Sequence, residues 1–328
     1  MDFRPSDDQE ALQQGVRSFC EGRVTTDHLR EIESQPKAFD RELWNELAEM
    51  GIFSLQVPEE QGGVGLKAAD AVLVFEELGR ACVPGPVLWS HLAAGHVDGA
   101  DLGETVVGGL DLTAPTIEPF MIEHLESLDR LILLKPDSVE VVEAGAVEGT
   151  SIEVPLDPLT PIHYAKSLPT GEAIGGVELA TQMRLMGTTL ASGLMLGIAE
   201  ATLEMANEYA KKREQFDRPI GSFQSIKHML ADSFVRQEAA RAAAYAAGAT
   251  LDFPEVGDVE RAVSSAKVVA GDAAMKNSRT CIQVHGGMGY TWEVPAHYFF
   301  KRTWVLENVF GGVHEHSDRI ADRVAAEA

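Results

Sequence analysis

The chain has 328 residues, which at about 150 residues per domain is enough for about two folded domains with a sizeable core. Its 27 basic and 51 acidic residues give a net charge of −24. Most of the surface therefore repels phosphate backbones and anionic lipid, and we expect neither a nucleic-acid nor a membrane partner. A hydrophobic fraction of 45% is typical of a globular protein and excludes a disordered one.

The three cysteines, Cys20, Cys82 and Cys281, lie far apart in the sequence and form no Cys-x-x-Cys pair. We expect neither a disulfide framework nor a thiolate zinc site, and a reducing cytoplasm fits this pattern. The start MDFRPSDDQE is acidic and polar, whereas a secretion signal needs basic residues followed by an apolar run. No stretch reaches about 18 uninterrupted apolar residues. The sequence therefore predicts a soluble, unprocessed, cytoplasmic protein.

The first hundred residues show helical periodicity. Apolar residues recur every three or four positions in the runs Leu12 to Phe19, Leu43 to Met50 and Val72 to Leu78. The segment Pro58-Glu-Glu-Gln-Gly-Gly-Val-Gly65 separates the last two runs. It is not a dinucleotide-binding loop, because no Val/Ile-rich strand precedes it and the third glycine is missing. This pattern predicts an N-terminal helical domain over residues 1–104.

The middle of the chain has a different pattern, with short apolar or alternating runs followed by several prolines. Leu131 to Leu134, Val139 to Val142 and Ile152 to Val154 are typical of short strands. They predict a small β domain over residues 105–174.

The remaining residues, 175–328, are rich in alanine and again helical. Apolar residues step by three or four from Leu190 to Tyr209, from Ile226 to Leu230 and from Val259 to Ala270. Short breaks between these runs are expected for antiparallel neighbours, so the pattern predicts a C-terminal four-helix bundle. The expected fold class is mainly α with a small β domain.

A basic cluster follows the first bundle helix in this otherwise acidic chain. It reads Tyr209-Ala-Lys-Lys-Arg213-Glu-Gln215-Phe216-Asp-Arg-Pro219-Ile-Gly221. Basic residues in a last helical turn also interact favourably with the helix macrodipole, which is one explanation. In the functional interpretation, the planar guanidinium of Arg213 binds a diphosphate, Gln215 hydrogen-bonds beside it and Phe216 supplies an apolar wall.

A glycine-rich segment follows a later bundle helix and reads Gln283-Val-His285-Gly286-Gly287-Met-Gly289-Tyr. Three glycines in four positions let the backbone approach a ligand closely and direct N–H groups at it. The alternative is a glycine at a helix C-cap, which needs only one of the three.

Together the two segments resemble the acyl-CoA dehydrogenase family, which carries Tyr-Ala followed by R-x-Q-F and, later, Q-x-x-G-G-x-G. Leu43-Trp44 to Gly51, Pro58-Glu-Glu-Gln-Gly-Gly and Glu76-Glu-Leu-Gly79 also resemble its first helical domain. The resemblance implies an α-β-α fold, FAD as cofactor and α,β-dehydrogenation of an acyl-CoA thioester. It also implies that the adenosine and diphosphate of an FAD held mainly by a neighbouring subunit contact Arg213, Gln215, Phe216, Gln224, Gln283, His285, Gly286 and Gly287.

The sequence departs from the family at the catalytic base. This chemistry needs a carboxylate that takes the α-proton while the flavin takes a hydride. Most members supply it as the Glu of a Y-E-G-T motif, but here Gly311 stands at that position and Val313 replaces the Thr. In other members the base lies early in the first bundle helix, where this chain has Gly187. The family's T-E-P-x-A-G-S-D loop has no match between residues 105 and 174, and the β region looks shortened.

These departures predict a subunit without a catalytic residue of its own. The shortened β region, the stretch Leu156-Asp-Pro-Leu-Thr-Pro161 and the absent base resemble the smaller chain of actinobacterial α2β2 enzymes that act on steroid-derived CoA thioesters. A catalytic acyl-CoA dehydrogenase chain would then be the partner and would hold most of the acyl-CoA.

Two alternatives remain open from the sequence. In the first, a self-sufficient homo-oligomer uses a displaced base, for which Glu178, Glu307 and Glu315 are the candidates. In the second, the chain is a helical scaffold or regulatory partner without flavin. No metal site is expected, because His314 and His316 are two residues apart on a helix and point to different sides.

Overall fold

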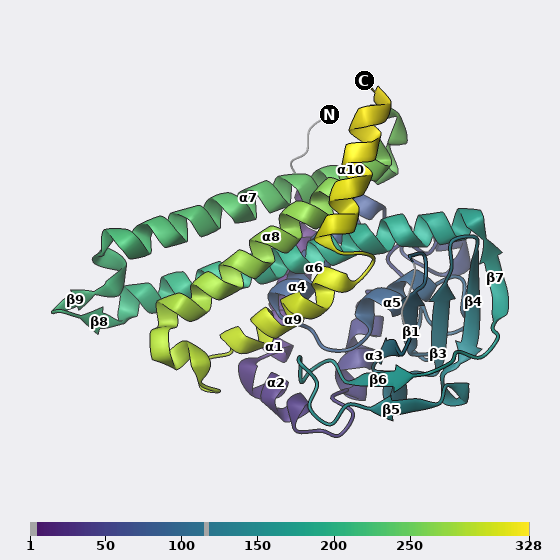
Figure 1. Cartoon of the computed structure of the whole chain (residues 1–328), viewed down its shortest axis with the longest axis horizontal. Coiled ribbons are helices and arrows are strands. Elements are labelled where there is room, and N and C mark those ends of the chain that lie inside the picture. Colours follow the sequence, from purple (N-terminus) through teal and green to yellow (C-terminus); the bar gives the residue numbers. More distant parts are fainter. Residues whose placement is uncertain (1–4, 115–117, 328) are drawn as a thin grey trace. The chain divides into compact units, whose positions relative to one another are not determined.

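The computed structural model describes residues 5–114 and 118–327. Helices precede residue 94, strands lie between residues 107 and 176, and long helices follow (Figure 1). This is the mainly α fold class with a small β region that the sequence predicts. Contacts divide the chain into two compact units: a bundle unit of residues 1–24, 72–83 and 189–328, and a strand unit of residues 25–71 and 84–188. The domain boundaries at residues 104 and 174 stay predictions.

The helical part of the strand unit consists of α2 (Thr26–Glu33), α3 (Arg41–Glu49) and α5 (Val87–Ala93). Helix α3 begins at Asp40, whose carboxylate accepts hydrogen bonds from the backbone N–H groups of the first turn and so satisfies donors that the helix leaves open. Trp44 on α3 is buried and packs on Phe53, with ring centroids 4.4 Å apart. Helix α5 is joined to the first strand because Ser90 Oγ lies 2.9 Å from both the N and the O atom of Val107.

The strands of this unit form two small sheets. One has the order β1-β3-β4-β7, in which β1 and β3 are parallel and the other pairs antiparallel: β1 (Val107–Asp111), β3 (Arg130–Leu134), β4 (Ser138–Glu143) and β7 (Glu172–Gly176). The other is antiparallel with the order β2-β6-β5: β2 (Phe120–Glu123), β6 (Ile162–Ala165) and β5 (Gly149–Ser151). The strand expected at Ile152 to Val154 is not formed at these residues, because the observed strand β5 lies just before them and ends at Ser151. Ile152 makes one further backbone bond, and Pro155 has no N–H to continue the ladder.

The bundle unit contains α1 (Asp7–Arg23), α7 (Gln224–Asp252), α8 (Val259–His285), α9 (Ala296–Asn308) and α10 (Val313–Glu327), together with most of α4 (Ala68–Arg80) and of α6 (Val177–Lys212). In Figure 1, α7 and α8 run beside the second half of α6. The buried Asn277 amide joins these three helices, donating to Ala199 O at 3.2 Å and Ser233 O at 3.0 Å. The segment after α8 is divided between α9 and α10. Within the described residues, no helix combines the length and apolarity that a membrane span requires.

Helices α4 and α6 touch through their backbones. A Cβ atom on Gly79 would lie 2.0 Å from Leu194 O, and one on Gly197 would lie 1.9 Å from Glu76 O. Only glycine fits at these two positions. This contact places two carboxylates of α4, at Glu76 and Glu77, inside the unit, where their side chains are 0% and 1% exposed.

The buried carboxylates are compensated by a network from four helices. Glu77 accepts two hydrogen bonds from Arg17, at 2.7 and 2.8 Å. Glu76 accepts one from Tyr245 at 2.7 Å and is paired with Arg241 at 3.3 Å. Burial raises the pKa of Glu76 to about 7, although Arg241 and Tyr245 oppose the shift. The free energy that is lost when a carboxylate leaves water exceeds the free energy that is gained from one ion pair of imperfect geometry.

We expect the stability of the bundle unit to fall as the pH rises from about 4.5 to about 7. In this window folded Glu76 retains a proton that the unfolded chain has released, so the native state binds more protons and deprotonation favours unfolding. Glu76→Gln should flatten this part of the pH profile, because the amide still accepts from Tyr245 and Arg241 keeps its pairs with Glu200 and Glu238. Thermal unfolding of the native protein and of Glu76→Gln from pH 4 to pH 8 measures this pH dependence. Identical profiles of the two proteins would contradict the role assigned to Glu76.

Candidate functional site

The basic segment after α6 forms a tight two-stranded hairpin. Strand β8 (Glu214–Gln215) pairs with β9 (Arg218–Pro219), and Phe216 and Asp217 form the two-residue loop. Both loop residues are left-handed, with φ of +53° and +60°. Hairpin loops of this kind prefer Asn and Gly, and an aromatic residue in this conformation costs about 1 kcal/mol or more. The Phe216 ring is 87% exposed, so the fold places it in solvent at a conformational cost.

Arg213 differs from the two lysines before it. Lys211 and Lys212 lie in the last turn of α6 and approach the Glu208 carboxylate, at 2.6 and 3.8 Å. Arg213 follows the helix end, where its backbone N donates to Tyr209 O and its O accepts from Ile220 N, both at 2.8 Å. Its side chain is exposed, and among the described residues it has neither a hydrogen bond nor an ion pair. The helix-end explanation therefore accounts for the lysines and leaves the Arg213 guanidinium without a structural role.

His285, the last residue of α8, is held by its own helix and by α6. Its Nδ1 lies 2.8 Å from Cys281 O, and its ring stacks on Tyr209 with centroids 4.2 Å apart. Burial lowers the pKa of His285, which favours the neutral ring. Because Nδ1 faces a carbonyl, it carries the hydrogen, and Nε2 is left as an acceptor. Burial also raises the pKa of the Cys281 thiol to about 12, so this cysteine is not a nucleophile.

The three glycines after His285 have three different explanations. Gly286 has a φ of +59°, a conformation that side chains disfavour, and forms the C-cap of α8. At Gly289 a Cβ would lie 2.6 Å from Ile282 O. At Gly287 the φ is ordinary and a Cβ would meet nothing within 4 Å. The fold therefore requires glycine at Gly286 and Gly289 but not at Gly287.

The structure brings the eight residues expected to contact the cofactor to one end of the bundle unit. The Tyr209–His285 stack and a core of residues such as Ala206 and Val284 join the end of α6 to the end of α8. His285 is buried with Nδ1 bonded, and the other seven are exposed: Arg213, Gln215, Phe216, Gln224, Gln283, Gly286 and Gly287. Gln215 donates to Glu214 O at 2.7 Å, and Gln224 is the first residue of α7.

The turn between α9 and α10 carries no carboxylate at Gly311. Gly311 has a φ of +96°, and a Cβ there would lie 2.8 Å from Glu315 Oε2. The turn is fixed from inside, because the buried Lys267 ammonium donates to Leu306 O and Val309 O. An L-side chain at Gly311 would require this turn to change.

The three candidate displaced bases lie in different environments, one ion-paired, one half-buried and one exposed to solvent. Glu315 on α10 is paired with Arg319. Glu307 is half-buried near the end of α9, and Glu178 is exposed in the first turn of α6. His316 is buried, with its ring nitrogens 3.1 Å from Ser264 Oγ and 2.9 Å from Phe310 O, while His314 is exposed. Across residues 5–114 and 118–327, no three His, Cys, Asp or Glu side chains are grouped as metal ligands.

Neither the cavity beside the hairpin nor the buried charge network was expected from the sequence. The network had a visible signal: Glu76 and Glu77 interrupt the apolar run Ala71 to Leu78, where charged residues need partners if the helix is buried. The cavity, lined in part by Asn207 and Lys227, had none, since these residues are ordinary for a helix surface and come from different helices.

Comparison with known protein families finds a match to each end of the chain. Residues 175–325 match the family model of the acyl-CoA dehydrogenase C-terminal domain, and residues 6–97 match that of the N-terminal domain. Acyl-CoA dehydrogenase IpdE2 of Mycobacterium tuberculosis is 30% identical over 310 residues, which cover 91% of each chain. The chain belongs to the acyl-CoA dehydrogenase family. Acyl-CoA dehydrogenase FadE34 of the same organism is also 30% identical, but the match covers 94% of this chain and only 46% of that protein, about half its length.

Solved structures of the family have the same fold. A chain in the crystal structure of the ChsE4-ChsE5 complex from Mycobacterium tuberculosis has a TM-score of 0.85 and 25% identity, with 99% of each chain covered. A chain of the Tcur3481-Tcur3483 steroid ACAD G363A variant also has a TM-score of 0.85, at 22% identity and 98% coverage of each, which shows the fold alone. The first of these is a complex of two differently named proteins.

Proposed function

We propose that this chain is a subunit of a heteromeric, FAD-dependent acyl-CoA dehydrogenase that has no catalytic base of its own. It contributes the adenosine and diphosphate contacts of the FAD to a catalytic partner chain in an α2β2 assembly. The similarity to one chain of the ChsE4-ChsE5 complex supports a heteromeric assembly. The resemblance to actinobacterial enzymes further suggests a steroid-derived CoA thioester as the substrate, which the partner holds.

The observation that carries the proposal is a set of surface residues that the fold does not need. Arg213 is exposed without a partner, Phe216 is exposed in a strained conformation, and Gly287 has room for a side chain that it lacks. All three lie where the family resemblance expects the FAD of a neighbouring subunit. A guanidinium suits a diphosphate, an aromatic ring suits an apolar or planar group, and a bare backbone permits close approach.

Gly311 supports the proposal that the chain has no catalytic base of its own. When bound, FAD supplies hydride acceptance from the β-carbon, and a carboxylate must remove the α-proton. Gly311 offers no such group, and its backbone conformation opposes a side chain. His285 Nε2 can accept a hydrogen bond and Arg213 can donate one, so both side chains are suited to bind and orient a cofactor.

The sharpest test compares Arg213→Ala with Lys212→Ala in the complex formed by coexpression with a full-length acyl-CoA dehydrogenase chain of the same organism. Loss of the Arg213 contact to a diphosphate should cost about 1.5 to 3 kcal/mol, or about 10- to 150-fold in FAD affinity. Lys212 is 79% exposed and lies 3.8 Å from Glu208, so its loss should change little. Flavin fluorescence during dialysis measures how much FAD each variant complex loses. Equal loss of FAD from the two variants would count against a diphosphate contact at Arg213.

The same preparations separate the alternatives. Yellow protein only after coexpression supports the proposal, whereas yellow, active protein from this chain alone supports a displaced base among Glu178, Glu307 and Glu315. Colourless protein with every partner supports a scaffold without flavin.

A further inference from the structure

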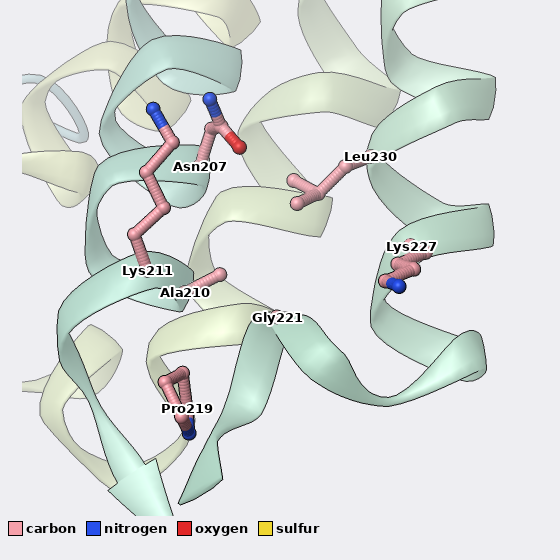
Figure 2. A pocket seen from close by; sticks show the side chains of 7 residues that line it. All are labelled: Asn207, Ala210, Lys211, Pro219, Gly221, Lys227 and Leu230. Carbon is pink, nitrogen blue, oxygen red and sulfur yellow. The ribbon is translucent and has the colours of Figure 1, made fainter.

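A cavity of about 480 Å³ lies between the end of α6 and the start of α7, behind the hairpin. Its size is within the range of small-molecule sites. In Figure 2, residues of α6 face residues of α7 across the space, and Pro219 and Gly221 of the connecting segment close one end. The lining consists of Asn207, Ala210, Lys211, Pro219, Gly221, Lys227 and Leu230. None of the eight residues expected to contact FAD belongs to it.

Two polar groups of the lining have no use in the fold. Among the described residues, the Asn207 amide and the Lys227 ammonium make neither a hydrogen bond nor an ion pair. Lys211 is different, because its ammonium is 2.6 Å from Glu208 Oε1. Ala210 and Leu230 belong to or pack against the bundle core, so the cavity combines an apolar wall with a cation and an amide that lack partners.

The surrounding charge favours an anion. Between residues 211 and 227 the chain has five basic and two acidic residues, a net charge of +3 in a protein whose total is −24. Lys227 lies in the first turn of α7, a helix of 29 residues that no side chain caps. The N-terminal end of a long helix carries partial positive charge, which adds to the attraction of Lys227 for a phosphate.

We propose that this cavity is a binding site for a phosphate-bearing small molecule, with Lys227 and Asn207 on the phosphate and Leu230 and Ala210 against its less polar part. A phosphate can accept from an ammonium and an amide at once, and the exposed ammonium of Lys211 can add a third contact when it leaves Glu208. The site is separate from the FAD contacts proposed above and does not depend on them.

The test uses the full chain without partner or flavin, titrated with inorganic pyrophosphate at low salt in a calorimeter. Lys227→Gln should weaken binding about tenfold, and Asn207→Leu, which keeps the volume and removes the amide, about fivefold. Lys212→Gln is the matched control, because Lys212 is an exposed cation of the same segment that neither lines the cavity nor belongs to the proposed FAD contacts, and the change should alter the affinity less than twofold. Arg213→Gln is measured beside it, because the proposed FAD site also offers a diphosphate contact. Thermal unfolding of each variant checks that the fold is intact.

Three outcomes would overturn the proposal. A larger loss in Arg213→Gln than in Lys227→Gln would place the anion at the expected FAD contacts instead. Equal losses in Lys212→Gln and Lys227→Gln would indicate unspecific attraction to the basic segment. Succinate binding as tightly as pyrophosphate, with the same loss in Lys227→Gln, would show a carboxylate site and exclude phosphate as the preferred group.

Discussion

The purified chain alone is expected to reduce no ferrocenium-type electron acceptor with any acyl-CoA, although catalytic members should turn over at roughly 1 to 100 per second. The physical reason lies at Gly311, which supplies no carboxylate for proton removal from the α-carbon, while the nearby Glu315 carboxylate is paired with Arg319. The measurement is anaerobic acceptor reduction by the chain with added FAD, compared with its coexpressed complex. Turnover by the chain alone at an ordinary rate would refute the assignment as a subunit without a base.

Restoring the missing carboxylate with Gly311→Glu should not restore activity. The φ of +96° disfavours every L-residue, and the new Cβ would meet the Glu315 carboxylate at 2.8 Å. Gly311→Ala is the matched control, since it introduces the same backbone strain without a charge. We expect both variants to lower the melting temperature to a similar degree and neither to gain turnover. A Gly311→Glu protein that gains turnover while Gly311→Ala does not would show that only the carboxylate was missing.

The elements of the fold follow from local patterns that the sequence displays. Apolar residues recur at helical spacing from Leu190 to Tyr209 on α6, which is buried on every side between residues 187 and 199, and Ser6 precedes α1 as a capping box with Gln9. The apolar run Leu131 to Leu134 and the nearly alternating run Val139 to Val142 form strands β3 and β4, as these local patterns predict. The turn that separates α9 from α10 was not expected. It depends on Lys267, which is far away in sequence and binds the carbonyls at the end of α9.

The candidate site could be predicted as a list of residues but not as a geometry. The motif around Arg213 and Gln215 indicates which side chains matter, yet the left-handed pair Phe216-Asp217 breaks the usual preference for Asn and Gly in such a loop. Sequence spacing also gives no means to separate Gly287 from Gly286 and Gly289. Their different roles appear only when the space around each Cα is known.

Features built from distant parts of the chain had no local signal. Arg17 pairs with Glu77 across 60 positions, and Arg241 pairs with Glu76 across 165. Each residue alone is typical of a solvated helix face, and only the backbone contact between α4 and α6 turns them into a buried network. The cavity near Lys227 follows the same rule, because a concave surface between two helices is a property of packing and not of either sequence segment.

Gly287→Val is expected to empty the flavin sites of the complex while leaving the chain folded. The new methyl groups would occupy the open space beside the backbone, where the proposal brings the adenosine or diphosphate of the partner's FAD. Since a Cβ at Gly287 meets nothing within 4 Å and the φ is ordinary, the substitution should shift the melting temperature of the isolated chain very little. Flavin released by heat, quantified by absorbance against protein, gives the number of FAD per complex.

This stoichiometry tests the whole assembly, because a chain that holds only the adenosine and diphosphate half of a site can express its binding free energy only in a mixed dimer. An α2β2 complex should then contain two FAD, and Gly287→Val should reduce that number toward zero. Gly22→Val is the matched control: a Cβ at the exposed Gly22 also meets nothing within 4 Å, and this position lies on α1, outside the proposed contacts. Four FAD per heterotetramer, or two FAD retained after Gly287→Val, would show that the cofactor does not pass over this glycine and that the proposed half-site is wrong.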